Sequence, residues 1–328
     1  MKVLYIGGTG EISYACLHES VAAGQDCTVF NRAQSGERLP GGVKQIVGDV
    51  GDAGSYSALA EQSFDMVCQF RAYTVAQIER DLEVFAGRTG QYVFISSALA
   101  YQKPPGKWML TEDVPLRNPY WPYSQAKADM EARLMEAHRG GVLPVTIVRP
   151  SHTYRCRFPS TCVSGDETAW RMLNHRPIVC HGDGQSVWTL THSSDFAAPF
   201  VKLLGNTVTL GQAYHVTGDQ AYTWDQILQS IGRVLGVEPR IVHVPTDTLI
   251  RYNKEWTGPL MGDKAWSALF DLGKLKSVVG AFRCSVVLEE GLRGALRYVQ
   301  ERLASSHPNV ELHALLDRIA GEQSELGT

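Results

Sequence analysis

Hydrophobic and polar positions follow one rhythm through the first half of the chain. Short runs of β-branched and aromatic residues alternate with longer amphipathic segments, and Gly-containing turns separate them. This rhythm predicts βαβ units, which build a parallel sheet. We expect strands at Lys2–Ile6, Asp26–Phe30, Lys44–Val47, Met66–Phe70, Tyr92–Ser96 and Pro144–Arg149. We expect helices near Ile12–Ala23, Ser55–Glu61, Val75–Arg88 and Tyr120–His138.

Two of these strands contain cores that are apolar or β-branched throughout, Val93–Ile95 and Val145–Val148. Strands of this kind are typical of a sheet that helices cover on both faces. The expected fold class is therefore α/β, with a doubly wound parallel sheet of Rossmann type.

The pattern is less regular after Pro150, where a loop with Cys and Arg residues is expected at Ser151–Ser164. Beyond it we expect strands at Val187–Thr191, Ala213–Val216 and Arg240–Val244. Helices are expected at Ser194–Leu204, Trp224–Leu235, Asp263–Asp271, Glu289–Ser305 and Val310–Gly321. This half is expected to add a smaller, discontinuous α/β domain to the first.

The composition argues against nucleic acid and membranes as partners. The 328 residues carry 31 Lys+Arg against 34 Asp+Glu, a net charge of −3, and no basic cluster that would attract a nucleic-acid backbone. The apolar stretches are far shorter than the roughly 20 residues of a membrane span, and Met1–Ile6 reads as a strand rather than a signal peptide. We expect a cytoplasmic protein without nucleic-acid or membrane partners.

The seven cysteines do not suggest a disulfide framework, because their number is odd and none lies in a Cys-x-x-Cys pair. A cluster near the middle of the chain is also too irregularly spaced for a zinc site. It consists of Cys156, Cys162, Cys180 and His181. No metal is expected.

A glycine-rich loop, Gly7–Ser13, follows the first strand and opens a helix. In this context it predicts a dinucleotide site, since glycines let backbone N–H groups approach a pyrophosphate at a helix N-terminus. Ser13 replaces the usual third glycine and is small enough to keep the packing. Glu11 would repel a pyrophosphate unless it points away or meets a cation or a hydroxyl. The loop residues expected at the cofactor are Gly7, Thr9, Gly10, Glu11 and Ile12.

The second strand ends at Asn31 and Arg32, where an acid usually binds the adenosine ribose. Arg32 can pair with a 2′-phosphate, so NADP is favoured over NAD, although both stay open. Asp49 and Val50, after the third strand, are expected near the adenine; for Asp49 a turn or helix N-cap role is an equal alternative. We thus expect residues 1–150, with 187–212, to bind the dinucleotide, and 151–186 with 213–328 to bind the substrate.

The fourth strand ends at Phe70, Arg71 and Ala72, which are also expected at the cofactor. Arg71 can meet a cofactor phosphate or an acidic group of the substrate, and a structural salt bridge is an equal alternative.

Tyr123 and Lys127 lie four residues apart on an expected helix, so they share one face. An ammonium near a phenol lowers a pKa that starts near ~10, which lets the tyrosine exchange a proton with a hydroxyl. Such a pair alone is more often a surface pair. Here, however, Ser96 and Ser97 end a central strand, where open α/β sheets bind ligands. Ser97 can hold a substrate oxygen while Tyr123 exchanges its proton.

These motifs resemble those of the extended short-chain dehydrogenase/reductase superfamily, the NAD-dependent epimerases, dehydratases and reductases. The resemblance rests on Gly7–Gly10, Ile95–Ser97 with Tyr101, and Tyr123 with Lys127. Weaker similarities reach about Tyr298, at Val148–Pro150, Asp195–Ala197, Tyr214–Gly218 and Thr223-Trp224.

The resemblance implies roles for individual residues. Ser97 would be the catalytic hydroxyl, with Ser96 beside it at the cofactor. Lys127 would bond the nicotinamide ribose, and Pro150 and its successors, His152 included, would line the nicotinamide. A homodimer through Val75–Arg88 and Tyr120–His138 is also implied.

Ala98 and Leu99 stand where the dehydratases of this superfamily carry Asp-Glu and where some epimerases carry a cysteine. Dehydration and epimerisation next to a carbonyl are therefore disfavoured. Hydride transfer with Tyr123 as acid or base remains, and it leaves epimerisation, oxidation and reduction open.

The substrate is expected to be a sugar hydroxyl or ketone, of a nucleotide-activated sugar first of all. The segment Ser151–Arg155 lacks the asparagine that many relatives use for the diphosphate, so an NADPH-dependent ketoreductase of a non-nucleotide small molecule is an alternative. Arginine can supply the diphosphate contacts instead, from Arg155, Arg157, Arg171 or Arg176. The residues expected at the substrate are Ser97, Ala98, His152, Arg155 and Trp188.

A non-catalytic dinucleotide-binding module is a third alternative, because relatives exist that sense redox state or bind RNA. The complete set of Ser97, Tyr123 and Lys127 argues against it, and the net charge of −3 argues against RNA.

Overall fold

A seven-stranded parallel sheet forms the larger lobe of the computed structural model, which describes residues 1–326. The strand order is β11-β7-β5-β4-β1-β2-β3. The strands are β1 (Lys2–Ile6), β2 (Asp26–Asn31), β3 (Lys44–Val47), β4 (Met66–Gln69), β5 (Gln91–Ile95), β7 (Val145–Pro150) and β11 (Gln212–Val216). The expected Rossmann-like α/β fold is thereby confirmed.

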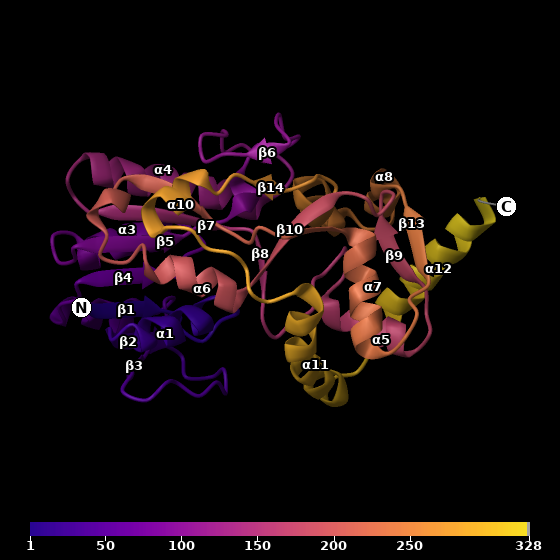
Figure 1. The fold of residues 1–328 in the computed structure, drawn as a ribbon, viewed down its shortest axis with the longest axis horizontal. Helices are drawn as coiled ribbons and strands as arrows, with labels where there is room; N and C mark the ends of the chain where they lie inside the picture. Colours follow the sequence, from indigo (N-terminus) through magenta and orange to yellow (C-terminus); the bar gives the residue numbers. More distant parts are fainter. Residues whose placement is uncertain (327–328) are drawn as a thin grey trace.

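Helices cover both faces of this sheet (Figure 1). One face packs against α1 (Ser13–Ala22), α6 (Ser193–Val201) and α10 (Gly273–Val279). The other packs against α2 (Ala53–Ser57), α3 (Val75–Phe85) and α4 (Pro122–Arg139). Every residue of β4, β5 and β7 is buried as a result, which explains their apolar composition.

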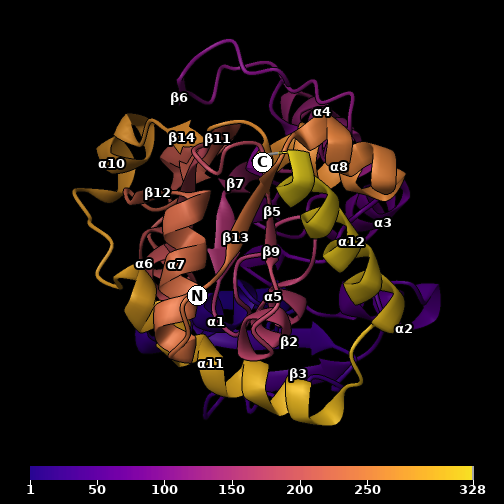
Figure 2. The ribbon, with the colours of Figure 1, turned by 90° about the vertical axis from the view of Figure 1, so that its right-hand side faces the viewer.

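The second lobe lies beyond the carboxyl ends of the strands, and α12 (Val310–Leu326) lies at the end of the molecule remote from β1 (Figures 1 and 2). It contains a sheet of β12 (Ala221–Thr223), β10 (Val187–His192) and β8 (His152–Tyr154), and a pair of β13 (Ile241–Val244) and β9 (Ile178–His181). Its helices are α5 (Gly165–Leu173), α7 (Trp224–Leu235), α8 (Thr246–Tyr252), α11 (Leu288–Ser305) and α12 (Val310–Leu326).

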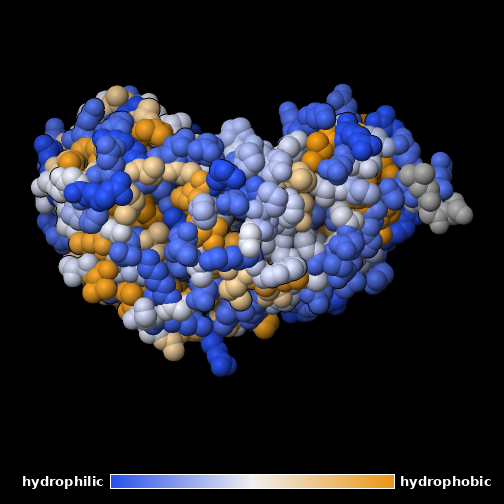
Figure 3. Space-filling view, turned by 90° about the horizontal axis from the view of Figure 1, so that it is seen from above, coloured by the Kyte–Doolittle hydropathy of each residue, from blue (hydrophilic) through white to orange (hydrophobic). Residues whose placement is uncertain are grey.

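The outline narrows between the two lobes when the molecule is seen from above, and hydrophobic side chains are scattered among polar ones on that face (Figure 3). Among the described residues, no helix combines the length and the hydrophobicity that crossing a membrane requires.

The helix expected at Asp263–Asp271 is wrong. A π-helical turn at Leu260–Lys264 is followed by the short strand β14 (Leu269–Phe270), which pairs with β6 (Met109–Leu110). The chain is extended here because Ala268 exchanges backbone hydrogen bonds with Val187 and Thr189 of β10. A partner this remote in sequence overrides the local helical pattern.

Two further expectations need correction. The loop expected at Ser151–Ser164 begins with β8, which pairs with β10. The domain boundary expected between residues 212 and 213 falls inside β11, which pairs with β7 in the large sheet, whereas β10 lies outside that sheet. In each case the pairing joins segments that are distant in sequence.

A buried ion pair fixes α4 against the sheet. Arg149 of β7 donates from Nε and Nη2 to the Glu131 carboxylate of α4, at 3.0 and 2.6 Å. The two side chains are only 7% and 4% exposed. Arg149 also donates to the Tyr101 hydroxyl at 2.8 Å, and that hydroxyl contacts Nε2 of His215 on β11. The ion pair therefore helps to hold α4 against β7.

We predict that Glu131→Gln lowers the free energy of unfolding by about 3–5 kcal/mol, because Arg149 keeps a buried charge without its counter-charge. The matched control is Glu79→Gln, which removes the partner of the more exposed Arg133 and should cost below about 1 kcal/mol. Urea unfolding followed by circular dichroism measures both. Equal losses in the two variants would contradict this role of the ion pair.

Candidate active site

The candidate site begins where the order of the sheet reverses, between the neighbouring strands β1 and β4. The loop after β1 needs its glycines, since Gly7 and Gly8 have φ angles of +119° and +77°. A Cβ on Gly8 would lie 2.8 Å from the Val29 methyl groups. The N–H of Gly10 donates to Ser13 Oγ at 2.9 Å, so the serine in the third glycine position stabilises the loop.

The Glu11 carboxylate is held by the segment that follows β8. Its Oε1 accepts from the backbone N–H groups of Arg155, Cys156 and Arg157, at 2.5, 2.7 and 3.2 Å. The Cys156 thiol donates to Oε2 at 3.2 Å. These donors offset the negative charge that was expected to repel a pyrophosphate, and they join the glycine loop to the second lobe.

A groove runs from this loop along the ends of β2 and β3. The predicted residues that line it are Gly7, Thr9, Gly10, Asn31, Arg32, Asp49, Val50 and Arg71. Arg32 Nη1 lies 3.9 Å from Asp49 Oδ2, and both side chains are about half exposed. Asp49 also accepts from the Gly51 N–H at 2.8 Å, so it has the alternative turn role as well.

The groove continues into a cavity of about 350 Å³, with Gly10 and Arg71 lining both. The other predicted residues in its wall are Glu11, Ile12, Phe70, Ser96, Ser97, Ala98, Tyr123, Lys127, Pro150, His152 and Trp188. Arg71 forms no salt bridge among the described residues and donates to the Tyr73 hydroxyl at 3.0 Å. Of the two alternatives for Arg71, the structural salt bridge is therefore not found in residues 1–326.

Ala72 and Arg155 are predicted site residues that do not line the cavity or the groove. The Ala72 carbonyl accepts from Lys127 Nζ at 3.0 Å, so it acts on the position of the lysine. Arg155 Nη2 pairs with Glu37 at 2.6 Å, and its guanidinium lies over the Tyr14 ring. The charge of Arg155 is therefore already paired, and its contact with substrate stays a prediction.

Ser97, Tyr123 and Lys127 come together at the centre of the cavity wall. Ser97 follows β5 and accepts from the Leu99 N–H at 3.2 Å. Tyr123 lies in the first turn of α4, after Pro122, which favours a helix start. Lys127 Nζ donates to the Ala72 and Ile95 carbonyls at 3.0 and 2.9 Å, and it lies 5.8 Å from the centre of the Tyr123 ring.

The pKa of Tyr123 differs from the expectation. Burial raises this pKa to about 12; Tyr73 acts in the same direction, and the hydrogen bond with Ser97 opposes it. Burial also lowers the pKa of Lys127 to about 8, against the opposite effect of Glu131. The expected lowering of the Tyr123 pKa by Lys127 is wrong for this structure, because desolvation dominates and the ammonium faces two carbonyls.

His152 packs against Trp188, with ring centres 5.4 Å apart. Burial lowers the pKa of His152 to about 3, and the nearby Lys264 adds to the effect. The imidazole is therefore neutral near pH 7 and can only form hydrogen bonds or packing contacts there.

Several residues of the cavity wall lie outside the site predicted from the sequence. They are Tyr73, Lys103, Leu110, Thr189, Asp263 and Phe270. None belongs to a motif, and the helix wrongly expected at Asp263–Asp271 placed Asp263 and Phe270 in a regular element. Long-range pairing brings them to the site.

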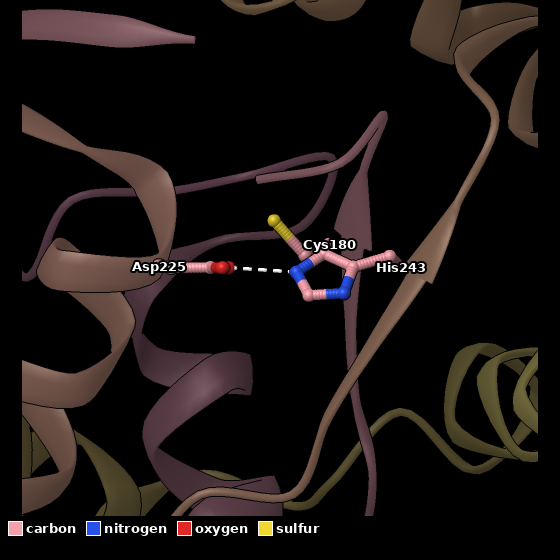
Figure 4. A group of neighbouring side chains, drawn as sticks. All are labelled: Cys180, Asp225 and His243. Carbon is pink, nitrogen blue, oxygen red and sulfur yellow. Dashed lines mark hydrogen bonds and ion pairs between the residues drawn. The ribbon is translucent and has the colours of Figure 1, made fainter. Parts of the chain in front are cut away.

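A separate group of polar side chains lies in the second lobe, where Cys180, Asp225 and His243 point toward one another (Figure 4). Asp225 Oδ1 pairs with His243 Nε2 at 2.8 Å, and Oδ2 accepts from Gln185 at 3.0 Å. The sequence cluster of Cys156, Cys162, Cys180 and His181 does not come together as a metal site. Within residues 1–326, only Cys180 of these four belongs to a group of three or more potential metal ligands.

Residues 3–216 match the model of the NAD dependent epimerase/dehydratase family. The chain is 24% identical over 295 residues to a 2'-dehydrokanamycin reductase of Streptomyces kanamyceticus, which covers 86% of this chain and 80% of that protein. It is 27% identical over 258 residues to the chloroplast stem-loop binding protein of 41 kDa b of Arabidopsis thaliana, which covers 74% of this chain and 65% of that protein. In structure it resembles the UDP-glucose 4-epimerase of Thermotoga maritima with UDP-glucose, with a TM-score of 0.72 and 20% identity over 92% of this chain and 100% of that one.

The low pKa of Lys127 predicts a dependence of stability on pH. Between pH 8 and about 10.4, the ordinary pKa of lysine, the unfolded chain holds a proton on Lys127 that the folded chain has released. Raising the pH through this window therefore stabilises the fold. We expect the unfolding free energy of the unaltered protein, relative to Lys127→Met, to rise by about 3 kcal/mol from pH 7 to pH 10.5. Urea unfolding of protein freed of any dinucleotide measures this difference, and a constant difference would refute it.

Proposed function

The chain belongs to the NAD dependent epimerase/dehydratase family, and on that premise we propose that it interconverts a secondary alcohol and a ketone on a small polyhydroxylated molecule. One observation carries the proposal. Ser97, Tyr123 and Lys127 line a single cavity that opens into the groove of the glycine loop.

The groove and cavity fit a nicotinamide dinucleotide. The glycine loop turns through Gly7 and Gly8 and leads into the N-terminus of α1, and Arg71 lines both the groove and the cavity. Ser96 Oγ is buried in the cavity wall without a hydrogen-bond partner in the described residues. We assign the adenosine end to Arg32 and Asp49 and the nicotinamide end to Pro150. When bound there, the cofactor would supply or accept the hydride.

The protein's own groups handle the oxygen and the proton. Ser97 donates a hydrogen bond to the substrate oxygen, and Tyr123 exchanges a proton with it. With a pKa of about 12 the phenol is protonated near neutral pH, which suits reduction, since Tyr123 then gives its proton to the carbonyl oxygen. Lys127 stays fixed by the Ala72 and Ile95 carbonyls, close to both groups.

Charge pairing favours a non-nucleotide substrate over a nucleotide sugar. Of the four arginines considered for a diphosphate, Arg155 pairs with Glu37, and Arg171 and Arg176 both pair with Asp317. The fourth, Arg157, is exposed and lines neither the cavity nor the groove. The similarity to a reductase across 86% of the chain points in the same direction. We therefore propose a ketoreductase, with epimerisation as the alternative. Mass spectrometry of dinucleotide released on denaturation separates them: stoichiometric NAD⁺ supports an epimerase, and an empty site that takes up NADPH supports the reductase.

We predict that Tyr123→Phe lowers turnover at least about a hundredfold, because the proton donor is lost, while NADPH binding stays within about twofold. A panel of sugar and aminosugar ketones, followed by nicotinamide absorbance, measures turnover. Tyr120→Phe is the control, since Tyr120 lies just before α4 and does not line the cavity. Full turnover by Tyr123→Phe would refute the mechanism.

We predict that the protein prefers NADP to NAD and that Arg32→Ala removes the preference. Losing one charged contact to the 2′-phosphate should weaken NADPH binding about tenfold or more and leave NADH binding nearly unchanged. Fluorescence titration with both nucleotides tests this. An equal effect on both, or tighter NADH binding by the unaltered protein, would contradict the NADP assignment.

A further inference from the structure

Lys103 and Asp263 contribute charge to the cavity that the mechanism above does not use. Both side chains line the cavity, and the residues are only 5% and 6% exposed. The Lys103 ammonium forms no hydrogen bond and no ion pair with any residue from 1 to 326. A buried ammonium of this kind is costly unless a counter-charge or an acceptor reaches it.

The backbone holds both residues in place. The N–H of Lys103 donates to the Arg117 carbonyl at 3.1 Å, and the N–H of Gln102 to the Pro115 carbonyl at 2.8 Å. Asn118 Nδ2 donates to the carbonyls of Leu99 and Gly262, at 2.8 and 2.7 Å. The loop after Ser97 is thereby tied to the turn that carries Asp263, so both charges keep a fixed position relative to the catalytic groups.

The charges in this part of the cavity do not cancel. Asp263 Oδ2 lies 3.4 Å from Nζ of Lys264, so its own neighbour compensates the carboxylate. Glu11, the other acid in the cavity wall, is bonded to the 155–157 backbone. Arg71 and Lys127 are also wall cations without an ion pair among residues 1–326, but they are assigned above to the cofactor and to Tyr123, so Lys103 is the wall cation without a role. Burial lowers the pKa of Lys103, against an opposing effect of Asp263, and a bound anion would favour its charged form.

We propose that Lys103 binds an anionic oxygen group of the substrate, a carboxylate or a phosphate, while Asp263 accepts a hydrogen bond from a substrate hydroxyl. The substrate class is then an acidic polyhydroxylated ketone or alcohol. This inference rests on the proposed function and sharpens it. An aminosugar with several ammonium groups would place positive charge next to Lys103 and is disfavoured.

Calorimetric binding to the NADPH-loaded protein tests the proposal without needing turnover. The probes are D-glucuronate, D-glucose 1-phosphate, D-glucose and D-glucosamine, which differ mainly in charge. We expect glucuronate or glucose 1-phosphate to bind about tenfold to a hundredfold more tightly than glucose. Whichever of the two binds tightly identifies the group as carboxylate or phosphate.

Variants assign the preference to one side chain. Lys103→Gln should abolish it and Lys103→Arg should keep most of it. Lys107→Gln, in the same loop with a side chain 55% exposed, should change nothing. The proposal is overturned if glucose or glucosamine binds as tightly as both acids, or if the acid preference survives Lys103→Gln. The absence of an acid preference in the unaltered protein overturns the proposal even if Lys103→Gln does not fold. If anion binding depends on Lys103 but Tyr123→Phe keeps full turnover, the anion site is retained and the proposed proton transfer by Tyr123 is rejected.

Discussion

The parallel direction of the seven strands is the constraint on which the rest of this structure depends. Parallel strands bring all their carboxyl ends to one edge, so the loops after β1, β4, β5 and β7 meet there although they are far apart in sequence. The sheet order reverses between β1 and β4 and leaves a crevice at that edge. The glycine loop, Arg71, Ser97 and Pro150 converge at this crevice because they follow strands.

The helix that carries Tyr123 and Lys127 is positioned by buried charge. The Arg149–Glu131 pair fixes α4 against β7. Lys127, on the same helix, donates to the carbonyl of Ala72 after β4 and to that of the last residue of β5. Because buried ion pairs are costly to separate, α4 has one favourable position on the sheet. The position of Tyr123 relative to Ser97 therefore depends on these buried interactions of α4.

Two polar side chains join the lobes around the cavity. Glu11 links the glycine loop to the chain after β8, and Asn118 links the loop after Ser97 to the turn at Gly262. Each makes several hydrogen bonds to backbone groups, which fixes whole segments instead of single side chains. The parts of the cavity wall that come from the two lobes are in this way attached to each other.

The sequence alone determined the sheet and most of the site, because these depend on local signals. The hydrophobic period and the turn residues predict the observed bounds of β1 and α7. The sequence motifs that follow the strands predict that Gly7 and Tyr123 lie at the candidate site. Tertiary structure decided the rest. The pairing of Ala268 with β10 replaced an expected helix and exposed Asp263 to the cavity. Arg155 pairs with Glu37 and does not line the cavity. Desolvation raises the pKa of Tyr123, where a lowering was expected. These outcomes depend on which distant groups become neighbours and on how much water they lose, and neither quantity is encoded in a local stretch of sequence.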